Sequence, residues 1–83
     1  MPRYYFDTHD FDTHDSERFI RDDEGLELEG LEAASIEAAA ALGEAARDAL
    51  LRSPPKEVAI EVRDESSKPV LRAVLSFRVE RPD

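Results

Sequence analysis

The stretch "LEAASIEAAAALGEAARDALLR", residues 31–52, decides the fold because it is the clearest helix in the chain. It has no proline, is rich in alanine, and repeats apolar residues at helical spacing. At about 100° per residue, one stripe collects Leu31, Ala34, Ser35, Ala38, Ala39, Leu42, Ala45, Ala46, Ala49 and Leu50, and Glu37, Glu44, Arg47 and Asp48 lie opposite. Gly30 is a passable N-cap, and Pro54 and Pro55 end the helix. We expect the alanine stripe to pack closely on a sheet, with Leu31, Leu42 and Leu50 as anchors.

Strand patterns flank this helix on both sides. "RYYFDT" (residues 3–8) alternates inward and outward residues, and "RFI" (18–20) predicts a short second strand, followed by a turn at Gly25 and an extended stretch into the helix. After the helix, "KEVAIEVRD" (56–64) and "KPVLRAVLSFRVE" (68–80) alternate apolar and polar residues around a polar hairpin loop at 64–69. The order β-β-α-β-β predicts an α+β fold, an antiparallel sheet of about four strands with the helix on one face.

One helix leaves the second face of such a sheet uncovered. That face would carry Tyr5, Val70, Arg72 and Val74, which makes it less polar than a fully solvated sheet face. These four residues are therefore our interface candidates. We expect a homo-oligomer, or a protein partner that covers this face or an exposed edge strand.

Composition limits the function further. A chain of 83 residues forms a single domain, residues 1–83, with a proline-containing linker at 53–56, and its lack of cysteine excludes disulfides and thiol chemistry. The net charge of −9 argues against direct nucleic-acid binding. No signal-like segment opens the chain, and its longest apolar run, residues 38–42, is far shorter than the ~20 residues of a membrane span. We expect a cytoplasmic protein without membrane contact.

The ten residues "FDTHDFDTHD" (6–15) are one five-residue word written twice. They supply the candidate metal ligands Asp7, His9, Asp10, Asp12, His14 and Asp15. An offset of five residues turns the second copy to the opposite face of a strand, so no regular element presents both copies alike. A tandem duplication tolerated near a loop therefore explains the repeat better than an evolved metal site, and adventitious metal binding lies between these alternatives.

No catalytic motif accompanies this repeat. The three glycines form no phosphate-binding loop, the serines lack a nucleophile-elbow context, and Asp22–Gly25 lacks the ligand spacing of a calcium loop. We therefore expect neither enzymatic activity nor a cofactor.

The segments "MPRYYFDTHD", "RFIRDDEGLELEGLEAA" and "EVRDESSKPVLRAVLSF" resemble a family of small bacterial proteins of unknown function. Its members typically open with Met-Pro-Arg-Tyr-Phe-Phe, contain an Asp-Glu-Glu-Gly-x-Glu-Leu segment before an alanine-rich helix, and end in a hairpin. The likeness is most specific at residues 2–6, 22–28 and 62–71. It implies a compact α+β domain and brings no catalytic residue, and the second copy of the repeated word is the main departure from the family pattern.

A looser likeness, at residues 25–34, is to small antitoxin domains that lead from strands into an alanine-rich helix. The sequence thus predicts a small binding or assembly module. An antitoxin-like regulator is the first alternative, and a metal-binding protein or metal-dependent enzyme that uses the repeat is the second.

Overall fold

The computed structural model describes residues 1–12, 17–52 and 55–82. It contains one helix, α1 (Leu31–Arg52), and five strands, which are β1 (Arg3–Asp12), β2 (Glu17–Ile20), β3 (Leu26–Glu27), β4 (Pro55–Arg63) and β5 (Pro69–Ser76). The predicted α+β fold with strands before and after one helix is confirmed. The expected extended stretch into the helix is the two-residue strand β3.

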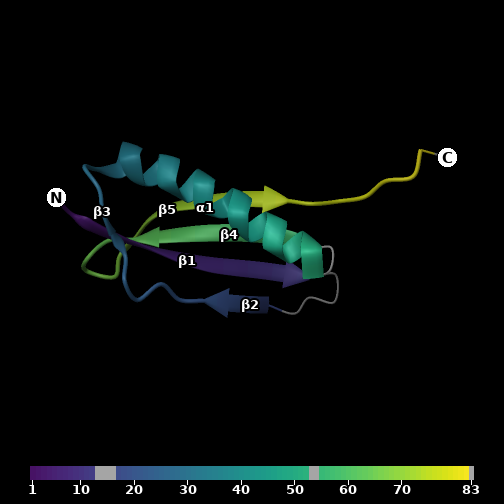
Figure 1. Ribbon diagram of the computed structural model, residues 1–83, viewed down its shortest axis with the longest axis horizontal. Helices are drawn as coiled ribbons and strands as arrows, with labels where there is room; N and C mark the ends of the chain where they lie inside the picture. The colour runs from purple at the N-terminus through teal and green to yellow at the C-terminus, as the bar shows by residue number, and fades with distance from the viewer. Residues whose placement is uncertain (13–16, 53–54, 83) are drawn as a thin grey trace.

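The sheet is antiparallel, with the strand order β2-β1-β4-β5. The long strand β1 has two partners along its outer edge, because β2 pairs with its residues 8–11 and β3 pairs with Arg3 and Tyr4. The other edge of the sheet is β5, which pairs with β4 alone among the described strands (Figure 1). The sheet therefore has one long edge strand, β5, whose outer side pairs with no described strand.

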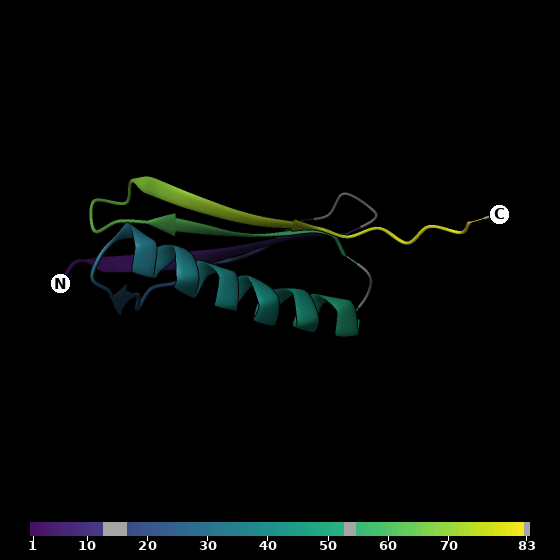
Figure 2. The same ribbon diagram turned by 90° about the horizontal axis from the view of Figure 1, so that it is seen from above.

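Helix α1 packs along one face of the sheet, and Figure 2 shows β4 and β5 together on one side of it. The buried residues of the helix are all alanines, Ala34, Ala38, Ala46 and Ala49, and they pack on Val58, Ile60 and Val62 of the central strand β4. The predicted packing of the alanine stripe on the sheet is confirmed for these four residues, whereas Ser35 and Ala39 of the same predicted stripe are exposed. No described helix combines the length and the apolar composition that crossing a membrane requires.

The three predicted leucine anchors have different environments. Leu42 is partly buried and packs against both core clusters, which agrees with the prediction. Leu31 and Leu50 remain 50% and 44% exposed, so they are not anchors. The alanines between these two leucines contact the sheet instead. Leu31 is the first residue of the helix, at the start of the predicted stripe.

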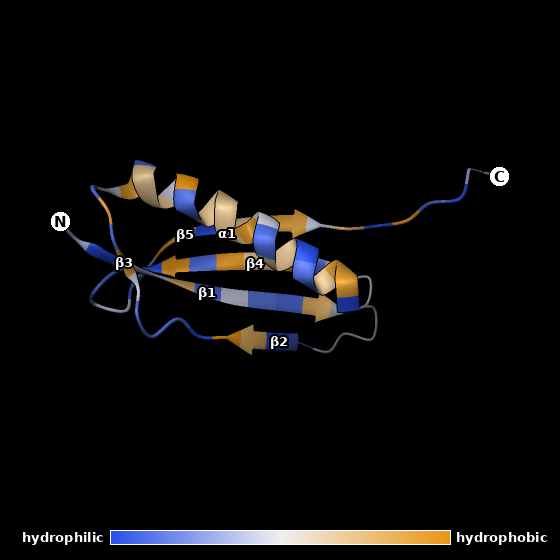
Figure 3. Cartoon of the chain, in the orientation of Figure 1, coloured by the Kyte–Doolittle hydropathy of each residue, from blue (hydrophilic) through white to orange (hydrophobic). Residues whose placement is uncertain are grey.

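Apolar and polar residues alternate along β4, as Figure 3 shows in orange and blue. The apolar set faces the helix, and on β5 Leu71 and Leu75 stand opposite Val62 and Val58. Val70 was predicted on the other face, and this placement is wrong: a register shift between Val62 and Arg63 lets Val70 pack against the helix-side core.

Two strand lengths also differ from the sequence prediction. The last strand was expected to reach residue 80, but β5 ends at Ser76, which pairs with Glu57 close to the beginning of β4. The pairing of β5 with β4 ends at this residue pair, although β4 itself begins two residues earlier, at Pro55. The first strand is longer than expected, because β1 continues through the whole first copy of the repeated word to Asp12.

Candidate functional site

The face of the sheet opposite α1 carries a buried ion pair between β1 and β4. Asp7 and Arg63 are the buried charged residues of the described chain, and their side chains are 5% and 9% exposed. Arg63 Nε donates to Asp7 Oδ2 at 2.7 Å and Nη2 donates to Oδ1 at 3.1 Å, so the contact is bidentate. The guanidinium also lies over the Tyr5 ring, 4.8 Å from its centroid. Planar, two-pronged geometry of this kind is specific to arginine.

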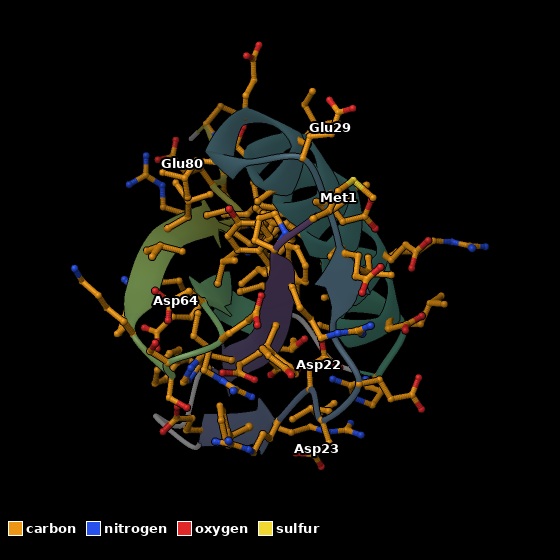
Figure 4. All side chains as sticks on the ribbon, turned by 90° about the vertical axis from the view of Figure 1, so that its left-hand side faces the viewer. Met1, Asp22, Asp23, Glu29, Asp64 and Glu80 are labelled. Carbon is orange, nitrogen blue, oxygen red and sulfur yellow. The ribbon has the colours of Figure 1, made fainter. Side chains whose placement is uncertain are left out.

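Asp22, in the segment between β2 and β3, completes the cluster. Its carbonyl oxygen accepts from Arg63 Nη2 at 2.7 Å, and its backbone N–H donates to Asp7 Oδ1 at 2.9 Å. Its own carboxylate accepts from the N–H groups of Phe6, Glu24 and Gly25 at 3.0 to 3.1 Å. We call Asp7, Arg63 and Asp22 the clasp. In Figure 4, Asp22 lies beside β1 and Asp23 points outward.

Electrostatics holds all three groups of the clasp in their charged forms. Burial alone would raise the pKa of Asp7, but hydrogen bonds from Arg63 and from the Asp22 N–H outweigh it and lower the pKa below 3.8. Burial likewise opposes ionisation of Asp22, and three backbone N–H donors still lower its pKa. The hydrogen bond to Asp7 raises the pKa of Arg63.

The backbone around the clasp requires a glycine at position 25. Gly25 has φ +70°, and a Cβ at this position would lie 2.8 Å from the carbonyl oxygen of Tyr4. A side chain would therefore both strain the turn and push it away from β1. Arg3 secures the same end of the sheet, because its Nη1 donates to the Glu24 carbonyl and its N–H donates to Glu65 Oε1.

The three segments that carry the family resemblance meet at this point. Residues 2–6 supply Arg3 and Tyr5, residues 22–28 supply the Asp22 turn and Gly25, and residues 62–71 supply Arg63. Segments that are distant in the chain thus form one contact network. The contacts of Arg3 and Tyr5 with the turn at Asp22 and with Arg63 give a physical reason why these three stretches belong together.

The chemistry of the clasp favours a structural role. A hollow of about 240 Å³ borders it, lined by Tyr5, Arg21, Asp22, Asp23, Arg63, Glu65 and Ser67. Asp7 already accepts three hydrogen bonds and has a lowered pKa, which makes it a weak base. No buried side-chain polar atom of the described residues lacks a partner. The clasp is therefore saturated by its own members.

The candidate metal ligands are divided between the two faces of β1. Asp7 belongs to the clasp and His9 shares its face, where His9 Nδ1 lies 2.6 Å from Glu17 Oε1 and its ring packs against Phe19 in a tilted arrangement. Asp10 points to the helix side and pairs with Arg52. Asp12 is the last residue of β1, and His14 and Asp15 lie outside the described residues. The described residues bring no three candidate ligands into one metal-binding group.

The interface candidates are also divided. Tyr5 lies under Arg63 and is partly buried, and Val70 is partly buried and packs against the core. Arg72 and Val74 remain exposed on the outer face of β5, where Arg72 Nη2 lies 3.8 Å from Glu57 Oε1. Of the four, only these two remain available on the surface.

Comparison with family models gives a match over residues 3–76 to a domain of unknown function, DUF6894. The chain belongs to the DUF6894 family. The match begins at the first residue of β1 and ends at the last residue of β5, so the DUF6894 domain is the complete sheet and helix described above. Comparisons with curated proteins and with solved structures gave no significant match. Membership in DUF6894 brings no activity with it.

Sequence reasoning did not find the clasp. The alternation along β1 and β4 does place Asp7 and Arg63 on the outward-facing sets of their strands, which is where they lie. The missing information was that β1 and β4 are neighbours, with Tyr5 opposite Arg63. One signal for this contact was available in the sequence. Each of the two strands carries a charged residue in its outward set, and both residues lie inside segments that carry the resemblance.

Proposed function

We propose that this protein is a small, non-enzymatic assembly module that associates through the free edge of β5. The observation that carries the proposal is the position of β5, an eight-residue strand at the end of the sheet. Its outward backbone N–H and C=O groups have no partner strand among the described residues. Such an edge is a template for pairing with another strand, and its main-chain hydrogen bonds supply affinity.

The exposed apolar side chains of β5 support this edge as the contact. Val74 and Leu75 are 44% and 45% exposed, and they point to opposite faces of the sheet. A strand added beside β5 would cover part of both side chains at once. The burial would add a hydrophobic contribution to the backbone pairing.

The outer face of the sheet is less suited to association than this edge. Its charges already form pairs, Asp7 with Arg63, His9 with Glu17, and Arg72 with Glu57. Covering the face would require these groups to lose water. The edge version of the interface is therefore favoured over the version that uses the sheet face.

Light scattering after size-exclusion chromatography, over a concentration series, tests the proposal. We expect a mass above that of the monomer that rises with concentration and returns to the monomer value in Leu75→Lys. The matched control is Leu51→Lys, which changes a 75% exposed leucine in the last turn of α1. Circular dichroism checks that both variants fold. A monomer at every concentration, or equal effects of the two variants, would contradict the proposal.

A further inference from the structure

The chain beyond β5 continues a strand pattern without a strand partner. Leu75, Phe77 and Val79 extend the apolar alternation of β5, but the residues after Ser76 form no described secondary structure. The tail leaves the sheet and runs past the end of α1 (Figure 2), and Val79 is 76% exposed. A strand-like sequence that extends beyond its own sheet is suited to a partner from outside the molecule.

We infer that residues 72–80 of two copies of this chain pair antiparallel about a two-fold axis at Ser76. The inference rests on the proposed function and specifies that the partner at the edge of β5 is a second copy of this chain. It would join β5 and the tail of each copy into one strand and merge the two sheets into a continuous one.

Charge and size complementarity select this register. With Ser76 opposite Ser76 of the partner, Arg72 stands opposite Glu80 of the other copy, and this favourable pair occurs twice. On the helix side, Ala73 then faces Val79, a small residue against a branched one, and Leu75 faces Phe77. On the other face, Val74 stands opposite Arg78, beside the Arg72–Glu80 pair. Opposite charges and apolar residues that face each other across strands stabilise a sheet.

The neighbouring registers are poorer. Residues directly opposite each other share a face of the sheet, so the two-fold axis must pass through a residue position. Moving the axis to the next residue changes every pair of opposite residues. An axis at Leu75 sets Arg72 against Arg78, which are like charges. An axis at Phe77 sets Arg72 against Pro82 and Glu80 against Val74, so it forms no pair of opposite charges.

The fold leaves room for this partner at the Ser76 end. Helix α1 crosses the sheet obliquely (Figure 1), and its last residue, Arg52, pairs with Asp10 on β1, away from β5. Leu75 is consequently uncovered on the helix side. Although the chain carries a net charge of −9, residues 72–80 contain two arginines against one glutamate, so this segment escapes the general repulsion.

Arg72 and Glu80 each form an ion pair within their own chain, and both of these pairs are exposed. Glu80 lies 2.8 Å from Arg78, with side chains 67% and 80% exposed, and Arg72 is at 3.8 Å from Glu57. Exposed pairs of this kind contribute little to stability. They do not hold Arg72 and Glu80 back from pairing between copies.

Disulfide trapping in the full chain tests the axis, because the chain has no cysteine of its own. We expect Ser76→Cys to form a disulfide-linked dimer under mild oxidation, since opposite residues in antiparallel strands lie within reach of a disulfide. Ser66→Cys, an exposed serine in the β4–β5 hairpin loop, is the matched control and should remain largely monomeric. Equal cross-linking of both variants would overturn the inference.

Charge reversal tests the register independently. We expect Arg72→Glu and Glu80→Arg each to weaken dimerisation about tenfold or more in sedimentation experiments, and the double variant to regain most of the loss. A dimer in which Ser76→Cys does not cross-link, or in which the double variant stays as weak as the singles, would overturn the inference while leaving the proposed function intact. A chain that remains monomeric at all concentrations would overturn both.

Discussion

Removing the negative charge from the clasp should destabilise the fold strongly. In Asp7→Asn the guanidinium of Arg63, which is 9% exposed, keeps its buried position but loses its counter-charge. Breaking a buried ion pair from one side typically costs about 3 to 5 kcal/mol. The Asp22 carbonyl and the Tyr5 ring still contact Arg63, so we expect a loss of about 3 kcal/mol.

The size of this loss matters because the domain is small. A chain of 83 residues is typically stable by about 4 to 12 kcal/mol. Asp7→Asn should therefore lower the urea midpoint markedly in a melt followed by far-ultraviolet circular dichroism at pH 7. Asp23→Asn is the matched control, because this residue lies in the same turn as Asp22 and its side chain is 82% exposed. We expect the control to change stability by less than about 0.5 kcal/mol.

A double-mutant cycle separates the ion pair from general damage at the site. Replacing both partners by apolar residues, as in Asp7→Leu with Arg63→Met, leaves no unpaired buried charge. The double variant should consequently lose less stability than the two single changes added together, by about 2 kcal/mol or more. Additive losses, or an Asp7→Asn variant as stable as Asp23→Asn, would refute the reasoning.

Three further outcomes are expected. Because the pKa values of Asp7 and Asp22 are lowered in the folded state, their stabilisation is present above pH 3.8 and is lost as the pH falls through the lower folded values; acid titration of unfolding should show this decline, and it should be shallower in Asp7→Asn. Leu42→Ala should cost about 2 kcal/mol in urea melts and Ile36→Ala less than about 0.5, since Ile36 is 68% exposed; the reverse order would contradict the packing. Deleting residues 11–15 should leave a folded chain by circular dichroism, because Asp10 and Arg18 already pair and two residues would remain to connect them. Calorimetry on that deletion and on the full chain also tests the metal hypothesis, which predicts tight zinc binding that only the full chain shows.

Regular periodicity made most of the fold predictable. The helix at residues 31–52 and the core of the β4–β5 hairpin follow from local patterns, and the structure confirms the helix to the residue. The end of β5 was not predictable in this way. Alternation continues to Val79, but a strand exists only where a neighbour pairs with it, and the pairing of β5 with β4 ends at Ser76.

The candidate site required information that is not local. Outward positions of Asp7 and Arg63 were predictable from alternation, but their contact depends on β1 lying beside β4. The misplacement of Val70 has a similar origin. A register shift at the end of β4 reverses the side of one residue, and no single-strand pattern signals such a shift.

The repeated word allows two registers of β1 against β4, and the two tyrosines that precede the word favour the observed one. A slip of β1 by five residues would bring the second copy onto the positions of the first, with Phe11 and Asp12 replacing Phe6 and Asp7 opposite β4. Within the word itself, the two registers are equivalent. Outside it they differ, because the slip would put His9 and Asp10 at the positions of Tyr4 and Tyr5.

The positions of Tyr4 and Tyr5 both require an aromatic side chain. Tyr4 is 7% exposed in the core beneath α1, and the Tyr5 ring stacks on Arg63. A histidine in the first position would lose apolar burial, and an aspartate in the second would remove the aromatic face that the guanidinium covers. The first copy therefore lies wholly within β1 because aromatic residues precede it, and Phe11 and Asp12 of the second copy are the last two residues of that strand.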